Sequence, residues 1–278
     1  MSRPEGLLLY TPEDAERNRW FISELCRYAE SEGLSLRLCL VQEGDPRPTF
    51  RQMPAFIVNR SRYSLFSTYA RDHGILCFNS AAVTAVTNDK FLTYDFCCRT
   101  HGIPMAKTRQ FRRQDSTNGL QYPLVAKPAD GHGGEDVAWI ADEATLQQYI
   151  SYFREKYPAP SYPFLLQEPV VTGWDVRIYV LSGEIYAAVL RTSENDFRSN
   201  FSLGGHAAVI EPDTAMQALV QRVQDILPLD FAGVDLLRHP DGGYLLGEIE
   251  DAVGCRMLYQ LTDKDPAKDY MRHIAQHI

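Results

Sequence analysis

Two of the most apolar segments near the carboxyl end of the chain contain acidic residues, and this restricts the fold more than any other feature. Asp235 lies in the segment VDLL, and Glu248 and Glu250 lie in the segment YLLGEIE. If both segments are strands, residues two positions apart face the same side, so Glu248 and Glu250 share a face. The stretch at 238–243 predicts a turn that would bring Asp235 beside them in an antiparallel pair.

Three carboxylates among apolar neighbours need positive charge nearby, because an unpaired buried carboxylate costs several kcal/mol. No histidine or cysteine accompanies the three acids, and oxygen donors alone are the usual ligands of Mg²⁺ and Mn²⁺. A metal site is therefore one interpretation of Asp235, Glu248 and Glu250. A solvated strand edge with scattered acids is the other, and these residues alone do not separate the two.

A second signal is the segment LVAKPADGHGGEDV, in which a predicted strand ends at Lys127 and glycines follow. Glycines allow backbone N–H groups to approach an anion, and Lys127 adds a positive charge at the same place. The segment is not a Walker loop, since GxxxxGKS and GxxxxGKT are absent, and it is not a GxGxxG turn that opens a helix. The pattern indicates anion binding, with an ordinary hairpin turn as the alternative.

Three arginines lie in otherwise apolar or glycine-rich surroundings. Arg177 and Arg191 stand on the two arms of a predicted hairpin that turns at 182–183, and Arg198 follows in the next loop. Guanidinium groups bind phosphate or carboxylate oxygens bidentately. The three are therefore candidates for an anion site, and pairing with acids nearby in the sequence, such as Asp175, is the structural alternative.

The order of the predicted elements divides the chain into two units. Short apolar strands alternate with amphipathic helices over about the first 85 residues, which predicts a small parallel α/β unit. A helix is expected over 88–100, closed by a glycine and by a proline beyond it. After a strand at 164–167 the pattern becomes mainly β, with one helix at 214–227 before the two closing strands.

Charge and composition disfavour several kinds of partner. The chain has 278 residues with 36 acidic and 28 basic side chains, and its formal charge of −8 opposes binding to nucleic acid or acidic lipid. No segment approaches the ~20 apolar residues of a membrane span, and the amino terminus lacks a signal-peptide core. The six cysteines show no zinc or CxxC spacing, which fits reduced thiols. We expect a cytoplasmic globular protein that binds neither nucleic acid nor membranes.

Taken in order, the motifs resemble the ATP-grasp superfamily, and within it the RimK-like carboxylate–amine ligases, which include alpha-L-glutamate ligases. The resemblance rests on NDK at 88–90, HGIPMAKT at 101–108, LVAKP with its glycine loop, LLQEPV at 165–170, GWDVRIYV, DFRSNFSLGG, and VDLL followed by GEIEDAVG. It is looser over the first 85 residues. It implies an α/β (α+β) ATP-grasp fold with an N-terminal pre-grasp domain at 1–85 and an ATP-grasp domain at 86–278. Within the latter, 86–165 would form a small lid-like subdomain with the glycine loop, and 166–278 a C-terminal subdomain with the metal carboxylates.

The resemblance also implies roles for residues of this chain. ATP phosphates would be neutralised by Lys90 and Lys127 beneath a loop that contains His132, Gly133 and Gly134. The adenine base and the ribose would be bound by Glu168, Pro169, Val170 and Asp175. Mg²⁺ (or Mn²⁺) would be held by Asp235, Glu248 and Glu250. The catalytic candidates are Arg198 and Asn200, to which we add Arg191, and the substrate-binding candidates are Arg60 and Arg177.

Glu250 departs from the family pattern, because it stands where the family more often has asparagine. The extra carboxylate either strengthens the metal site or pairs with a cation such as Arg256, and we favour coordination. The role of Arg177 is also open, since it could contact phosphate or pair with Glu168 or Asp175.

The implied activity is ATP-dependent formation of an amide bond between a carboxylate and an amino acid or amine. The reaction would pass through an acyl phosphate and release ADP and phosphate, and Arg198 would stabilise the oxyanion formed when the amine attacks. The carboxylate would belong to a small molecule or a peptide, and the protein could form a homo-oligomer. A small-molecule kinase of the same superfamily and a nucleotide-binding protein without turnover are the alternatives.

Overall fold

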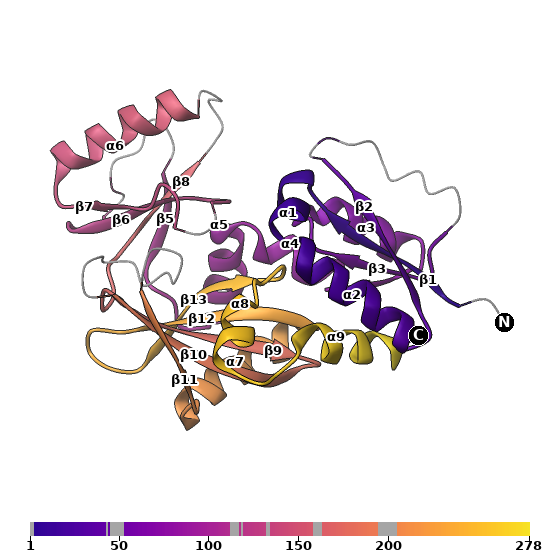
Figure 1. Cartoon of the computed structure of the whole chain (residues 1–278). Coiled ribbons are helices and arrows are strands. Elements are labelled where there is room, and N and C mark those ends of the chain that lie inside the picture. The colour runs from indigo at the N-terminus through magenta and orange to yellow at the C-terminus, as the bar shows by residue number, and fades with distance from the viewer. Residues whose placement is uncertain are drawn as a thin grey trace.

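The computed structural model describes residues 3–42, 44, 53–111, 117, 119–131, 134–157, 163–193 and 205–278. In this part of the chain the strands form three sheets, which Figure 1 shows as separate layers at the upper left, at the right and below. No helix within these ranges is long and apolar enough to cross a lipid bilayer.

The first unit is a parallel α/β layer, as the alternation of strands and helices predicts. Its elements are β1 (Glu5–Tyr10), α1 (Pro12–Arg17), α2 (Arg19–Ser31), β2 (Ser35–Leu40), β3 (Phe56–Asn59), α3 (Ser64–Asp72) and β4 (Leu76–Phe78). The strands lie in the order β2-β1-β3-β4, and each neighbouring pair is parallel. Leu7, Leu8 and Leu9 of the central strand are buried, because helices cover both faces of such a sheet. Thr11 caps α1 by accepting a hydrogen bond from the backbone N–H of Asp14.

A helical connection leads from the first sheet to the second. It consists of α4 (Ala81–Thr87), α5 (Lys90–Thr93) and a π-helical segment, η1 (Tyr94–Thr100). The helix predicted over 88–100 is confirmed as a helical segment that starts two residues later, at Lys90, and its last seven residues are π-helical. The Asp89 carboxylate caps it by accepting hydrogen bonds from the backbone N–H groups of Phe91 and Leu92, at 2.7 and 2.9 Å.

The second sheet is antiparallel and has its own hydrophobic core. It contains β5 (Thr108–Phe111), β6 (Leu124–Pro128), β7 (Ala138–Ile140) and β8 (Phe164–Gln167), in the order β5-β8-β6-β7, and α6 (Glu143–Lys156) covers one face. Tyr149, Ile150 and Phe153 of α6 pack with Phe164 in a cluster of residues that belong to this unit. The strand predicted at 164–167 is confirmed with these bounds.

The third sheet carries the predicted hairpin and the two acidic strands. It contains β9 (Trp174–Leu181), β10 (Glu184–Thr192), β11 (His206–Ile210), β12 (Phe231–Arg238) and β13 (Tyr244–Glu250), in the antiparallel order β11-β10-β9-β12-β13, with α7 (Thr214–Ile226) packed against it. Ser182 and Gly183 make the hairpin turn with φ values of 56° and 79°. Because β9 lies between β10 and β12, its side chains can reach partners on both neighbours.

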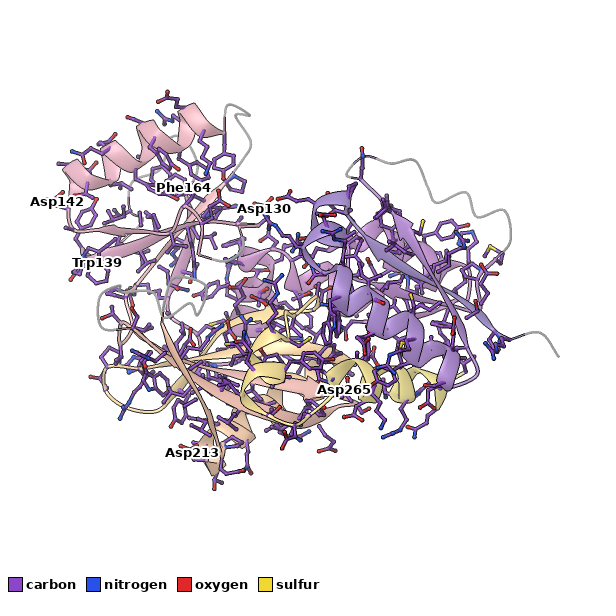
Figure 2. The ribbon with its side chains drawn as sticks, viewed as in Figure 1. Asp130, Trp139, Asp142, Phe164, Asp213 and Asp265 are labelled. Carbon is purple, nitrogen blue, oxygen red and sulfur yellow. The ribbon has the colours of Figure 1, made fainter. Side chains whose placement is uncertain are left out.

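Two further helices, absent from the sequence prediction, join the carboxyl end of the chain to the first unit. They are α8 (Arg256–Leu261) and α9 (Pro266–Ala275), and α9 packs against α2 (Figure 1). Asp265, labelled in Figure 2 at the start of α9, accepts a hydrogen bond from Tyr28 of α2. One hydrophobic cluster includes Leu8 of β1, Phe231 of β12 and Tyr270 of α9. The division of the chain at residue 85 therefore stays a prediction. The carboxyl-terminal helix α9 packs against the first unit and so joins the two ends of the chain.

Candidate functional site

A cavity between the second and third sheets brings together most of the residues that the sequence singled out. Figure 2 shows Asp130, which follows β6, on the side of the second sheet that faces the rest of the molecule. Among the predicted site residues, the described wall of the cavity contains Lys90, Lys127, Gly134, Val170, Asp175, Arg177, Arg191, Asp235, Glu248 and Glu250. Apart from Gly134 and Val170, which lie in loops, these residues come from α5, from β6 and from four strands of the third sheet, so the cavity depends on long-range packing.

The three acids of β12 and β13 lie side by side, as the turn at 238–243 predicts. Antiparallel pairing sets Asp235 opposite Glu248 and Gly233 opposite Glu250. The pairing is irregular just after Asp235, and Gly247 occupies this point. A Cβ atom at Gly247 would lie 2.8 Å from the Leu237 side chain and 3.1 Å from the Asp235 carbonyl oxygen, so glycine permits the close approach of the two strands.

Two buried arginines hold the acids in a continuous ion-pair network. Arg177 donates to Asp235 through Nε and Nη2, both at 2.7 Å, and to Glu250 through Nη2 at 2.8 Å. Arg191 donates to Asp235 at 2.8 Å and to both carboxylate oxygens of Asp175, at 2.5 and 2.9 Å. The network thus runs from Asp175 to Glu250 through alternating charges, with each arginine bridging two acids.

This network settles the two pairings that the sequence left open. The alternatives of Glu168 or Asp175 as the partner of Arg177 are wrong, since its partners are Asp235 and Glu250. The suggested pairing of Glu250 with Arg256 is wrong as well, because Arg256 donates to the backbone carbonyl of Arg17. Register explains the difference, because Asp235 lies opposite Arg177 on the neighbouring strand.

The ion pairs and burial shift the pKa values of the three acids in different directions. Burial opposes ionisation of Asp235, but Arg177 and Arg191 outweigh it and hold the pKa of Asp235 well below its usual range. Burial also opposes ionisation of Glu248, and the ammonium of Lys90 more than offsets it, so the pKa of Glu248 is lowered. For Glu250, burial raises the pKa, and Arg177 does not fully compensate because Asp235 and Glu248 repel it.

The two lysines enter the cavity from different elements. Lys90 Nζ lies 3.1 Å from Glu248 Oε1 and also donates to the backbone carbonyl of Gly131 in the glycine-rich segment. Lys127 Nζ donates to Gln167 Oε1 at 2.8 Å. Burial lowers the pKa of Lys127 to about 8, and the neighbouring charge of Lys90 acts in the same direction against the attraction of Glu248.

Several predicted site residues lie elsewhere or cannot be placed. Glu168 pairs with Lys107 at 3.5 Å, both side chains being more than two-fifths exposed, and neither Glu168 nor Pro169 belongs to the described wall of the cavity. Arg60 lines a separate pocket. The remaining four predicted residues lie outside the described part of the chain: His132, Gly133, Arg198 and Asn200.

The cavity also contains residues that sequence reasoning missed. Gln167 is buried at the end of β8, where it accepts from Lys127 and donates to Thr108 Oγ1 at 2.8 Å. Trp174 begins β9 and stacks on Tyr244. The signal that could have identified Gln167 is its position as the one polar residue of the strand FLLQ. Trp174 gave no such signal, since an aromatic residue in a strand is usually part of a core.

The chemistry of the acids suits a hard cation, but their present contacts do not form a ready cluster. Asp235, Glu248 and Glu250 offer only oxygen donors, which Mg²⁺ and Mn²⁺ prefer. Each carboxylate has a lysine or arginine partner, and within the described ranges no group of three or more acidic, histidine or cysteine side chains is arranged to hold a metal ion. The metal assignment therefore stays a prediction. It requires the lysine and arginine partners to give up some of their ion pairs with the carboxylates.

Comparison with known proteins gives consistent matches. A family model described as the RimK-like ATP-grasp domain matches residues 87–274. The alpha-aminoadipate–LysW ligase LysX of Sulfurisphaera tokodaii is 28% identical over 225 residues, 79% of each chain. A probable alpha-L-glutamate ligase of Hahella chejuensis is 26% identical, over 74% of this chain and 68% of the relative. The ATP-grasp ligase PsnB, solved with a phosphomimetic variant of its minimal precursor, Mg and ADP, shares the fold with a TM-score of 0.68, 15% identity and full coverage of both chains.

Proposed function

Because the chain belongs to the RimK-like ATP-grasp family and is an ATP-dependent carboxylate–amine ligase, we propose that the cavity between its second and third sheets binds ATP and activates a carboxylate. The observation that carries this proposal is the meeting of Lys90 and Lys127 with Asp235, Glu248 and Glu250 in one cavity wall. Two lysines from separate elements and three acids on paired strands match the needs of a triphosphate and its metal ion.

The chemistry requires two steps. A carboxylate oxygen attacks the γ-phosphorus of ATP and ADP leaves, which gives an acyl phosphate. The amine then attacks the carbonyl carbon, inorganic phosphate leaves, and the amine nitrogen loses one proton as the amide forms. The first step spreads negative charge over phosphate oxygens, so fixed cations and exact positioning supply most of the acceleration. No nucleophilic serine or cysteine is needed.

The charges on the cavity wall support a requirement for Mg²⁺ with the nucleotide. Four cationic side chains, Lys90, Lys127, Arg177 and Arg191, face five acidic ones, Glu135, Asp175, Asp235, Glu248 and Glu250, on the described wall. This leaves a formal excess of one negative charge, so the wall alone does not neutralise a triphosphate. Asp235, Glu248 and Glu250 would hold Mg²⁺, whose positive charge would reduce the repulsion between the wall and the phosphates. For Glu248 to hold the ion, Lys90 would have to give up its ion pair with Glu248 and bind phosphate instead.

Other residues have supporting roles in this proposal. Arg177 and Arg191 position the acids through the ion pairs described above, and Asp175 is available to the ribose only if it shares its oxygens with Arg191. Gln167 and Val170 lie on the wall where we propose the base binds. The second sheet with α6, which has its own core, would act as the lid, and we assign Arg198 and Asn200 to the reacting groups on the family resemblance.

We infer that one substrate is an amino acid and the other a small-molecule or peptide carboxylate. Two relatives are named after alpha-aminoadipate and alpha-L-glutamate, and PsnB was solved with a precursor. Hydroxylamine distinguishes this ligase from an enzyme that only phosphorylates an alcohol. With Mg-ATP, the correct carboxylate and hydroxylamine, the protein should yield a hydroxamate and ADP in equal amounts. ATP consumption without hydroxamate, across a broad panel of acids, would contradict the acyl phosphate.

The kcat/KM for ATP is expected to fall as the pH rises above about 8. Burial lowers the pKa of Lys127 to about 8, so its positive charge in the free enzyme is present below this pH and is lost above it. The loss should approach about tenfold per pH unit, since kcat/KM reports the free enzyme. Lys127→Arg should flatten this limb, because guanidinium stays charged. A wild-type profile that does not change between about pH 7 and 9.5 would contradict the role of Lys127.

A further inference from the structure

A second pocket lies between the first unit and the segment that follows the acidic strand β13. It opens at the junction of α1 and α2, beside the end of β3 and the start of α8. The residues that matter are Arg17, Trp20, Phe21, Arg60, Arg256 and Tyr259. The pocket is distinct from the proposed ATP cavity, because the described residues lining the two have no member in common.

Arg60 gives this pocket a buried positive charge. Its side chain donates to the Tyr10 hydroxyl at 2.6 Å and to the Val253 carbonyl at 2.8 Å, and the residue is only 4% exposed. Both of these acceptors are neutral, and the buried Asp251, which interacts electrostatically with Arg60, accepts its hydrogen bond from Asn88 instead. A buried guanidinium held only by neutral groups is costly, and an anion in the pocket would relieve this cost.

The rest of the wall combines further cations with aromatic surfaces. Arg256 donates to the backbone carbonyl of Arg17 at 2.7 Å, while the Arg17 side chain pairs with Glu13 outside the pocket lining. Trp20 and Tyr259 meet edge to face with ring centroids 4.7 Å apart, and Phe21 lies under Arg60 at 5.1 Å. Cations beside aromatic walls favour a ligand with one negative group and an apolar body.

The pocket and the proposed ATP cavity lie close together on the same face of β12. A Cβ atom at Gly233 would lie 2.7 Å from Val253 of the pocket and 3.5 Å from Arg177 of the cavity. The Val253 carbonyl is also the group that Arg60 binds. A molecule in the pocket is therefore close to the activation site, yet its bound anion is kept apart from the lysines that would hold ATP.

We propose that this pocket binds the amine substrate by its free carboxylate, and that this substrate is an amino acid with an aliphatic or aromatic side chain. The proposal rests on the ligase function given above. A ligase that uses an amino acid as its amine must leave that amino acid's carboxylate unactivated, and Arg60 holds it away from the site of phosphoryl transfer. The apolar walls distinguish this substrate from the acidic amino acids after which two relatives are named.

Calorimetric titration of the full chain with L-phenylalanine, L-leucine, L-glutamate and L-phenylalaninamide tests the proposal. The two apolar amino acids should bind, and the amide, which lacks the carboxylate, should bind at least about tenfold more weakly, as loss of a charged hydrogen bond implies. Glutamate should also bind more weakly than phenylalanine. Equal binding of phenylalanine and its amide would overturn the proposal.

Substitutions at exposed residues of the pocket test the proposal without unfolding the protein. Trp20 is 57% exposed and Arg256 is exposed, so Trp20→Ala and Arg256→Ala should fold, and each should weaken phenylalanine binding by about threefold or more. Arg71→Ala is the matched control, because Arg71 is exposed on α3 and pairs with Asp72. Unchanged binding in both pocket variants would overturn the proposal.

Steady-state kinetics separate this proposal from the ligase function. Trp20→Ala and Arg256→Ala should raise the KM for the amino acid and leave the KM for ATP unchanged. Amide formation with an unchanged KM for the amino acid would reject the pocket and keep the ligase. Binding of phenylalanine in the pocket, with no ATP turnover for any acid and amine pair, would keep the pocket and reject the function.

Discussion

Glu248→Gln should lower Mg-ATP turnover by on the order of a hundredfold or more, the loss typical when one group that stabilises a charged transition state is removed. Glutamine keeps the size of the side chain but removes the negative charge that we propose holds Mg²⁺. It also removes the ionic partner of Lys90, 3.1 Å away. Phosphate release with Mg-ATP and both substrates measures the effect.

Nucleotide binding shows whether the loss arises from the metal. Without Mg²⁺, the variant should bind ADP as well as or better than the wild type, since one negative charge has left the wall. Added Mg²⁺ should strengthen ADP binding to the wild type and not to the variant. Glu184→Gln, at the exposed first residue of β10, is the matched control. Wild-type turnover in Glu248→Gln would remove the metal assignment.

Arg177→Met should destabilise the fold by about 3–5 kcal/mol, the cost of breaking a buried ion pair by removing one partner. Arg177 is 8% exposed and binds Asp235 and Glu250, so its loss leaves both carboxylates short of positive charge. Asp235 keeps its ion pair with Arg191, so the loss of Arg177 affects Glu250 more than Asp235. Urea unfolding at neutral pH measures the difference as a shift in midpoint.

A second substitution identifies the cause of this destabilisation. Glu250→Gln in the Arg177→Met background should recover part of the stability, because it removes one of the two carboxylates that lost their partner. Arg71→Met is the control for removal of an exposed arginine, with an expected change within about 0.5 kcal/mol. If Arg177→Met unfolds at the wild-type midpoint, the ion-pair network does not support the sheet.

The parts of the fold that the sequence predicts are those with a local cause. The strand at 164–167 and the parallel order of the first unit follow from short apolar runs separated by helices. The juxtaposition of Asp235 with Glu248 follows from one hairpin, since a short turn allows only neighbouring strands to pair. Each of these predictions rests on patterns within single segments or between segments that follow one another in the chain, within reach of pattern reasoning.

What the sequence did not predict depends on contacts between distant segments. Arg177 and Asp235 are 58 positions apart, and they meet only because β9 lies between β10 and β12. The helix predicted over 88–100 begins only at Lys90, where the Asp89 cap and the bond from the Lys90 backbone to the Ala129 carbonyl determine its first residue. Gln167 belongs to the cavity because its strand pairs with the one that carries Lys127.

The packing of α9 against α2 also bears on how a shortened protein should be designed for crystallisation. The match to the family model begins at residue 87, which makes it a tempting starting point for expression. Such a fragment would lack α2 and β1. It would expose a hydrophobic surface to water, formed by residues that are now buried: Tyr270, Met271 and Ile274. Fragments of this kind tend to aggregate, so the amino-terminal layer belongs in any preparation made to study the ligase.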